Sequence, residues 1–332
     1  MNSSVVQNDL PTNLKRGHRK ADVVILGAGF SKSFGVPLAN ELLKELVSRY
    51  AKSFPSIKYV DAFVKDFYPN LVAGHEYPDI EDFLAMTETA VAYSQIRNTT
   101  NRGYYWRPKI IADLMSTVNK CLGDYLWNYQ KTVPIGLVVS VDKLLSHLRD
   151  NPVFVSFNYD LLLETALSEL GRKFKYGLSY DQNDISILKP HGSINWFQTG
   201  TLSTLPIIHI GKNIEVPITL EKDQLRLKRW KESIIVIPSP IKKIDLFEMK
   251  KMWTSFTSVV STLNSLTVIG YSLPHTDKLS RLVIRRAGPF QANCKNIVIV
   301  DPSSIVVDTF RKYVSSRSTG FTGKFVDWIA VI

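Results

Sequence analysis

Two polar corners in this chain carry side chains that can do chemistry, and each corner follows an apolar run. The run 152–157 leads directly into Asn158 and Asp160, and His191 stands beside Gly192 where another apolar run ends. An amide can hydrogen-bond a water or a hydroxyl group as donor and as acceptor. An imidazole can take a proton from such a group near neutral pH. We therefore predict that Asn158 and His191 are catalytic residues that activate a water or a hydroxyl group.

These residues also have structural interpretations. Asn158 or Asp160 can cap the helix expected over 161–170, although both doing so would be redundant. A histidine is usually a structural residue, and we interpret five of the six in this way: His18, His75, His147, His209 and His275. A histidine beside glycine at a strand end is well positioned and partly exposed, so His191 is treated separately.

A glycine turn links the first apolar run, residues 23–26, to a helical pattern over residues 37–50. Glycines without Cβ atoms let a backbone turn tightly and approach a ligand. A strand, a glycine turn and a helix together point backbone N–H groups at a phosphate. The candidate phosphate-binding residues are Gly27, Ala28, Gly29, Phe30 and Ser31. A purely structural turn is the alternative, because the third glycine of the dinucleotide fingerprint is missing.

Strand and helix patterns alternate over most of the chain. Buried strands are expected at 233–237, at 266–270 and at 296–301. This alternation predicts one α/β domain over residues 21–332, a Rossmann-like, doubly wound parallel sheet. We expect the last segment, 321–332, to form a terminal strand pair.

Two of these strands end in further candidate binding residues: Gly270, Tyr271, Ser272 and Asp301. In open parallel sheets, ligands sit at the carboxyl edge of the strands, and an acid at that edge can hold ribose hydroxyl groups.

Helical patterns dominate between about residues 53 and 150, so we expect a helical insertion subdomain there. Within it, the sequence from Tyr77 to Asp82 predicts a helix start with acids in its first turn. A ligand contact of Asp79 or Glu81 is the alternative.

The composition of the 332-residue chain, with 45% hydrophobic and 21% charged residues, is typical of a globular protein. No apolar run is long enough to cross a bilayer. Residues 1–20 are basic and lack the apolar core of a secretory signal, so they predict a flexible arm. Two cysteines, Cys121 and Cys294, cannot build a four-cysteine zinc site. They fit a reducing cytoplasm, and we expect a cytoplasmic protein without a metal.

The formal net charge of +11 permits several partners. A basic surface can bind nucleic acid or anionic nucleotides, or an acidic protein. The charges are scattered and no recognition-helix or zinc-finger pattern accompanies them. A solvated basic surface is therefore the preferred interpretation, and direct nucleic-acid binding stays open.

Taken in order, the motifs of this chain resemble the sirtuin-like family. The matching pieces are Gly27–Ser31, Gly35–Pro37, Asn158–Asp160, His191–Gly192, Gly270–Leu273 and the strand ending at Asp301. The forms of Phe157–Asp160 and Lys189–Trp196 resemble the bacterial defence-associated branch more than the protein deacetylases. Two departures point the same way. The zinc module of the deacetylases is missing, and Leu38–Asn40 stands where they continue with Phe-Arg.

The resemblance implies an enzyme that hydrolyses NAD to nicotinamide and ADP-ribose, with NAD as substrate and without a metal. It implies a role in anti-phage defence, by abortive infection through NAD depletion. Gly27–Ser31 would take the pyrophosphate and Asp160 would orient the nicotinamide end. Gly270–Ser272 and Asp301 would take the adenosine half.

Such an activity is toxic unless it is controlled. We therefore expect a homo-oligomer or an operon-encoded partner, such as an ATPase, a short Argonaute or a nucleotide-sensing subunit. Two alternatives stay open. One is an NAD-dependent protein deacylase or ADP-ribosyltransferase, and the other is a non-catalytic module that binds an NAD-derived nucleotide.

Overall fold

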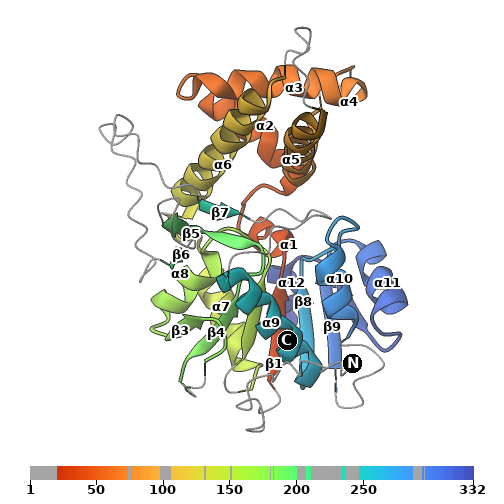
Figure 1. Ribbon diagram of the computed structural model, residues 1–332. Coiled ribbons are helices and arrows are strands. Elements are labelled where there is room, and N and C mark those ends of the chain that lie inside the picture. The colour runs from red at the N-terminus through yellow and green to blue at the C-terminus, as the bar shows by residue number, and fades with distance from the viewer. Residues whose placement is uncertain are drawn as a thin grey trace, which may run out of the picture.

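A computed structural model gives the arrangement of the chain (Figure 1). It describes residues 21–73, 76–97, 106–130, 132–149, 152–179, 181, 183–199, 207–210, 233–235, 247–286, 294 and 296–332. The expected N-terminal arm, residues 1–20, lies outside the described residues.

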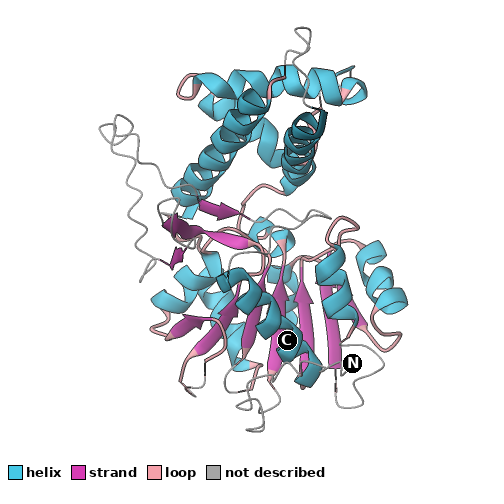
Figure 2. Ribbon diagram, viewed as in Figure 1, coloured by secondary structure: helices cyan, strands magenta, loops and turns pink. Residues whose placement is uncertain are grey.

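A parallel sheet of seven strands forms the centre of the molecule, in the order β10-β9-β8-β1-β2-β4-β3 (Figure 2). Its strands are β1 Asp22–Leu26, β2 Val153–Ser156, β3 Phe174–Tyr176, β4 Ile185–Leu188, β8 Ser265–Ile269, β9 Asn296–Asp301 and β10 Thr319–Thr322. Every pairing between them is parallel. The predicted Rossmann-like, doubly wound parallel sheet is confirmed.

Helices cover both faces of this sheet, which explains why its central strands are apolar on both sides. Val24 and Leu26 of β1 belong to the core on one face, while Val23 and Ile25 belong to the core on the other. The first face carries α7 Leu137–Ser146, α8 Leu162–Glu169 and α12 Phe325–Val331. The second face carries α9 Phe247–Thr262, α10 Lys278–Arg285 and α11 Ser304–Tyr313.

A helical lobe stands beyond the carboxyl edge of the sheet, at the top of Figure 1. It contains α2 Ala39–Tyr50, η2 Pro55–Lys58, α3 Tyr59–Phe67, α4 Pro69–Ala73, α5 Ile80–Arg97 and α6 Pro108–Gln130. Aromatic side chains fill its centre, where the ring of Phe63 lies 5.3 Å from Phe83 and 5.1 Å from Trp106. The insertion was expected over residues 53–150. The lobe already begins with α2, whereas α7 packs beside the sheet against α8 and α12.

Two segments differ from the sequence-based expectation. The strand expected at 233–237 is β7 Ser233–Ile235, and it pairs antiparallel with β5 Gly192–Thr199 in a separate sheet that also contains β6 Ile207–Ile210. The terminal strand pair is wrong, because β10 is a parallel edge strand and α12 follows it. Phe325 and Ile329 have helical spacing, and both are buried in the core beneath the sheet.

Candidate functional site

Three sequence-predicted corners meet where the order of the sheet reverses. β1 lies between β2 and β8, and the chain continues outward from β1 in both directions. The corners that follow these three strands carry Gly27, Asn158 and Gly270. In doubly wound sheets this switch point, outside the carboxyl ends of the strands, is where ligands bind. The fold therefore places the predicted residues at its expected ligand site.

Glycines allow the corners after β1 and β8 to touch. A Cβ on Gly29 would lie 2.6 Å from the Cα of Gly270, and a Cβ on Gly27 would lie 2.4 Å from the carbonyl oxygen of Gly270. Gly270 itself has a φ of +61°, which favours glycine. The N–H of Gly29 donates to the carbonyl of Gly270 at 2.9 Å. This N–H group is therefore used within the protein, contrary to the expectation that the whole turn faces a phosphate.

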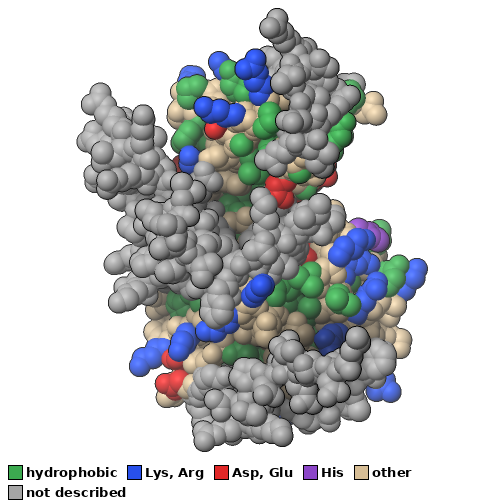
Figure 3. Space-filling view, in the orientation of Figure 1, with side chains coloured by type: hydrophobic (Ala, Val, Ile, Leu, Met, Phe, Trp, Pro, Cys, Tyr) green, Lys and Arg blue, Asp and Glu red, His purple; other side chains and the backbone are tan. Residues whose placement is uncertain are grey.

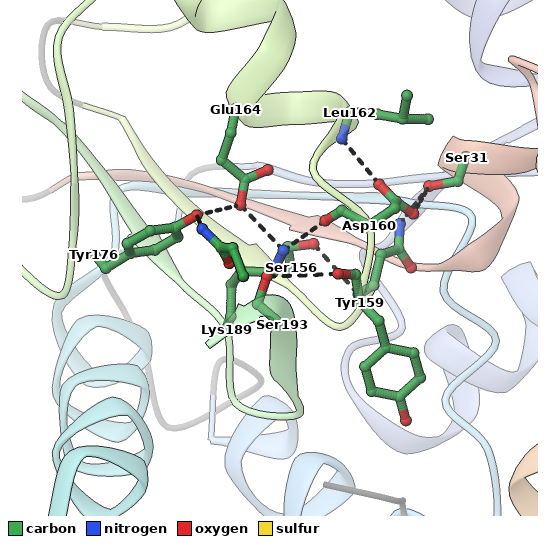
Figure 4. A network of polar contacts seen from close by, with 11 residues as sticks. Ser31, Ser156, Tyr159, Asp160, Leu162, Glu164, Tyr176, Lys189 and Ser193 are labelled. Atoms are coloured by element: carbon green, nitrogen blue, oxygen red, sulfur yellow. Dashed lines mark hydrogen bonds and ion pairs between the residues drawn. The ribbon is translucent and has the colours of Figure 1, made fainter. Parts of the chain in front are cut away.

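Asn158 is held by the corner after β1. Its Nδ2 donates to the carbonyl of Gly27 at 2.9 Å and to Oγ of Ser31 at 2.9 Å. Ser31 Oγ in turn donates to Oδ2 of Asp160 at 2.7 Å, as the dashed lines of Figure 4 show. Both hydrogens of the Asn158 amide have partners in the protein, so its Oδ1 is the group that can serve a ligand or a water, as an acceptor. The sequence predicts an amide that acts as donor and acceptor, whereas the structure leaves only the acceptor for a ligand.

Asp160 combines a structural role with its place at the site. Its Oδ1 accepts the N–H of Leu162 at 3.1 Å, at the start of α8. Its carbonyl oxygen accepts a hydrogen bond of 2.6 Å from Nζ of Lys189, a lysine that is fully buried. The helix-start interpretation and the site interpretation of Asp160 are thus both compatible with its position.

Lys189 anchors the Asn158–Asp160 corner through a buried polar network (Figure 4). Its Nζ lies 3.0 Å from Oε1 of Glu164, and that oxygen also accepts from the hydroxyl of Tyr176 at 3.1 Å. The hydroxyl of Tyr176 accepts from Nδ2 of Asn195 at 3.0 Å. A buried charge has to be paired, and here the pair also fixes the backbone beside Asn158.

His191 reaches the site from a tight turn between β4 and β5. The N–H of Gly192 donates to the carbonyl of Lys189 at 3.0 Å, and Gly192 has a φ of +83°. The imidazole was expected to be partly exposed, but only 2% of His191 is exposed. Its Nε2 lies 2.9 Å from Oδ2 of Asp277, a fully buried residue. Its ring centroid lies 4.8 Å from that of Phe157.

A cavity of about 480 Å³ opens at this edge of the sheet. Most of the predicted site residues line it, namely Gly27, Ala28, Ser31, Asn158, Asp160, His191, Gly270, Tyr271 and Ser272. Asn158 and His191 therefore face the same space, beside the first glycine turn. Ligand pockets commonly have volumes of about 300–1,000 Å³, so this cavity is large enough for a small molecule.

The other three predicted residues, Gly29, Phe30 and Asp301, do not line the cavity. Phe30 points into the core, where its ring lies 5.3 Å from that of Phe325. Oδ1 of Asp301 accepts the N–H of Ser303 at 2.9 Å, ahead of α11. Burial raises the pKa of Asp301 despite this hydrogen bond. Its place at the end of β9 thus serves the turn into α11.

The helical lobe contributes carboxylates to the opposite wall of the cavity. Asp79 and Glu81 both line it, close to the start of α5. Oδ1 of Asp79 accepts the N–H of Glu81 at 2.8 Å, as a helix cap does. Burial raises the pKa of Asp79, although hydrogen bonds from the backbone of Glu81 and Asp82 oppose the shift. Both the helix-start interpretation and a ligand contact therefore fit Asp79.

Sequence reasoning missed Asp277 and the function of Lys189. Asp277 precedes the amphipathic segment 278–285, and an acid before such a segment indicates a helix cap. That signal predicts its contact with the N–H of Ser280, which is 3.2 Å long. Nothing in the sequence indicates that the same carboxylate also contacts His191.

Basic side chains gather over α10 and α11, as Figure 3 shows. The exposed ones are Lys278, Arg285, Arg286, Arg311 and Lys312. The ring of Tyr313 lies 5.3 Å from the guanidinium of Arg281, 4.8 Å from that of Arg285 and 5.2 Å from the ammonium of Lys312. A solvated basic surface stays the preferred interpretation, and binding of nucleic acid or of an acidic partner stays an open alternative.

Two further observations concern metals and membranes. Among the described residues, no group of three or more His, Cys, Asp or Glu side chains is placed to hold a metal ion. None of the helices within the described ranges has the length and apolar character needed to cross a membrane.

The fold and the site define the class of the protein: an α/β protein with a ligand cavity at the switch point of a doubly wound sheet. No family model matches the sequence, and no curated protein matches it.

The chain is similar to solved structures of Sir2 homologues. One is a mutant complex with 2′-O-acetyl-ADP-ribose, at 14% identity, with 93% of this chain and 88% of that chain covered and a TM-score of 0.48. A second is a Sir2 homologue in complex with NAD, at 14% identity, with 93% of this chain and 86% of that chain covered and a TM-score of 0.45. A third is Sir2Tm bound to a propionylated peptide, at 14% identity, with 94% of this chain and 91% of that chain covered and a TM-score of 0.42. Because identity and scores are low, we infer neither the family nor the activity from them.

Proposed function

We propose that this protein is an NAD glycohydrolase that cleaves NAD to nicotinamide and ADP-ribose. The observation that carries the proposal is the shared cavity. Asn158 and His191, from corners 33 residues apart in sequence, line it together with the glycine turn after β1. An amide can position a water, an imidazole can take its proton, and a close backbone approach can hold a dinucleotide, so these groups suit cleavage of a ribosyl bond by water.

The chemistry assigns a separate task to each group. The nicotinamide–ribose bond breaks through an oxocarbenium-like transition state, as in glycoside hydrolysis. Oδ1 of Asn158 accepts a hydrogen bond from the attacking water, since the amide hydrogens are bound to Gly27 and Ser31. His191 accepts the proton that this water or a ribose hydroxyl group releases. The new C–O bond forms as the C–N bond breaks, and nicotinamide leaves as a neutral molecule.

Carboxylates around the cavity suit a positively charged ribosyl group. Asp79, Glu81 and Asp160 line it from two sides. In a cavity with little water, fixed negative charges stabilise a developing positive charge more strongly than they do in bulk solvent. This charge distribution supports NAD, whose nicotinamide ring is cationic, as the substrate.

The biological setting is part of the proposal. An uncontrolled glycohydrolase would consume cellular NAD, so we propose a cytoplasmic effector of anti-phage defence that acts by abortive infection. Its activity would be gated by homo-oligomerisation or by an operon-encoded partner, such as an ATPase, a short Argonaute or a nucleotide-sensing subunit. The helical lobe and the basic α10–α11 surface are the candidate contacts.

A protein deacylase or ADP-ribosyltransferase is the second candidate function. The same cavity would serve it, because both reactions begin at the nicotinamide–ribose bond. A deacylase or transferase requires an acceptor for the ADP-ribosyl group, whereas a glycohydrolase uses water. The reaction products therefore distinguish the two candidate functions. A non-catalytic nucleotide-binding module would bind NAD and release no nicotinamide.

Product analysis tests the proposal. The protein is purified alone and with its co-expressed operon neighbours, and each preparation is incubated with NAD, with and without acylated peptide. Nicotinamide and ADP-ribose are quantified, and cellular NAD is measured after expression with these neighbours. We expect free ADP-ribose without an acceptor, and its loss in Asn158→Ala and His191→Ala, by about 100- to 10,000-fold for His191→Ala. Asn264→Ala and His147→Ala are the matched controls. Asn264 is a buried asparagine at the opposite edge of the sheet, and His147 lies on the surface.

Two results would contradict the proposal. ADP-ribose that appears only as acyl-ADP-ribose would identify a deacylase. Full turnover by His191→Ala would remove the catalytic assignment.

A further inference from the structure

We propose that Asp277 is the positioning residue of His191: it fixes the imidazole ring and keeps the ring proton on Nε2, so that Nδ1 is the nitrogen that accepts the proton in the reaction. This inference rests on the proposed function for its kinetic consequence. Its structural part, the state of the ring, can be tested independently.

The contact between the two side chains is short and buried. His191 Nε2 lies 2.9 Å from Oδ2 of Asp277, and the exposed fractions of the two residues are 2% and 0%. A carboxylate in such surroundings accepts hydrogen bonds and has none to donate. Nε2 must therefore carry the hydrogen that lies between them. In a neutral imidazole this leaves Nδ1 as the acceptor nitrogen.

The carboxylate is itself held in place by α10 and by the corner after β8. Oδ2 of Asp277 accepts from the hydroxyl of Tyr271 at 3.0 Å and from the hydroxyl of Ser280, and Oδ1 accepts the N–H of Ser280 at 3.2 Å. Asp277 is thus the N-cap of α10. A capping carboxylate also lies at the positive end of the helix dipole, which favours its charged form. Asp277 therefore has a fixed position from which to act on His191.

The loop that carries Asp277 is braced from the other side. Leu273 adopts a φ of +56°, a conformation that is uncommon for a leucine. Its carbonyl oxygen accepts a hydrogen bond of 2.9 Å from Nη1 of Arg281, on α10. Leu273 is also 1% exposed, so packing on the core helps to hold it there. The distance from the corner after β8 to α10 is therefore set by contacts that do not involve His191.

Aromatic rings limit the motion of the imidazole. Phe157 lies 4.8 Å from the ring centroid of His191 and stacks on Tyr271 at 4.3 Å. Trp253 lies 6.2 Å from the same imidazole. A ring flip would break the Asp277 contact and leave a buried carboxylate with one donor fewer. The arrangement selects one ring orientation and one tautomer.

Asp277→Asn tests the proposal, because asparagine is as good an N-cap as aspartate and α10 is retained. The amide can donate a hydrogen to Nε2, which moves the ring proton of His191 to Nδ1. The ¹⁵N shifts of the His191 imidazole, assigned with His191→Gln, report this change of tautomer. We expect kcat for nicotinamide release to fall by about 100- to 10,000-fold with KM changed only a few-fold. Asp22→Asn is the matched control: Asp22 is a buried carboxylate with three donors at the opposite edge of the sheet.

The outcomes separate this proposal from the proposed function. If the imidazole of folded Asp277→Asn keeps the proton on Nε2, or if kcat is unchanged, the positioning role is wrong. If Asp277→Asn does not fold, as judged by circular dichroism, the tautomer in the native protein decides: a proton on Nδ1 overturns the proposal and one on Nε2 supports it. If the native protein, co-expressed with its operon neighbours, releases no nicotinamide while its His191 carries the proton on Nε2, the proposed function fails and the positioning role stands.

Discussion

The substitution Asn158→Asp tests the internal geometry of the site by changing one NH₂ group to an oxygen. In the native protein that NH₂ group donates to the carbonyl of Gly27 and to Oγ of Ser31, each at 2.9 Å. A carboxylate oxygen in its place faces the carbonyl of Gly27, and oxygen then opposes oxygen. The shape of the side chain is otherwise retained, so the effect reports the two lost hydrogen bonds and the added charge.

The expected loss follows from what the change leaves unpaired. Each of the two hydrogen bonds contributes about 1 kcal/mol net, and the carbonyl of Gly27 keeps one donor, the N–H of Phe30 at 2.9 Å. The buried, unpaired negative charge adds to this. We expect Asn158→Asp to lower the free energy of unfolding by about 3–5 kcal/mol near neutral pH. Asn158→Ala introduces no charge and is expected to lose about 1–3 kcal/mol.

The sign of the pH dependence sharpens the prediction. Repulsion raises the pKa of the new carboxyl group in the folded state above its unfolded value of about 3.9. At a pH above the raised pKa, the variant therefore has a lower free energy of unfolding than the native protein. This loss becomes smaller as the pH falls toward the pKa of the unfolded state, because the protonated carboxyl group can donate to the carbonyl of Gly27. Urea unfolding of the native protein and both variants, at about pH 7.5 and about pH 4.5, measures this. Equal stability of Asn158→Asp and native protein at the higher pH would refute the hydrogen-bond assignment.

Two further predictions concern the supports of the site. Lys189→Met leaves the carboxylate of Glu164 buried without its cationic partner, so it should lower the free energy of unfolding by about 3–5 kcal/mol in urea unfolding. The double variant with Glu164→Gln should regain part of this loss. A Lys189→Met variant as stable as the native protein would contradict the pairing. Gly270→Ala adds a Cβ that would lie 2.4 Å from the Cα of Gly29, at a position where the φ of residue 270 is +61°. We therefore expect a lower midpoint of thermal unfolding, and weaker NAD binding measured by calorimetry. A variant with unchanged midpoint and affinity would show that the two corners can separate at no cost.

The strands and their polar corners could be predicted because the information is local. An apolar run bounded by glycine or by an amide defines both the buried strand and the residues at its end, as at residues 23–27 and 153–158. The strand-to-helix alternation then implies a parallel sheet. The switch point gathers these ends, so the sequence leads to the shared edge without any knowledge of side-chain contacts.

The contacts that complete the site could not be predicted, because they join residues far apart in sequence. Ser31 and Asp160 are 129 residues apart, and Lys189 and Glu164 are 25 apart. Hydrophobic periodicity carries no information about such pairs. Phe30 was misassigned for a related reason: its place in the glycine motif indicated a ligand, whereas the short helix α1 Ala28–Lys32 turns its ring into the core.

The C-terminal segment shows a different limit. Residues 319–322 form a strand and residues 325–331 form a helix, so one short apolar segment contains both. The strand β7 was predicted as a strand, but its pairing with β5 in a separate sheet was not, since an apolar run does not specify the sheet that it joins. Element type is local information, and pairing is not.

Release of nicotinamide from NAD in the absence of any acceptor tests the central claim most directly. The protein is co-expressed and purified with its operon neighbours, and the products are followed by chromatography beside Asn158→Ala and His191→Ala. The account predicts equal amounts of nicotinamide and free ADP-ribose from the native protein and a collapse of both in the two variants. NAD that is bound but recovered intact, or turnover that survives both substitutions, would contradict it.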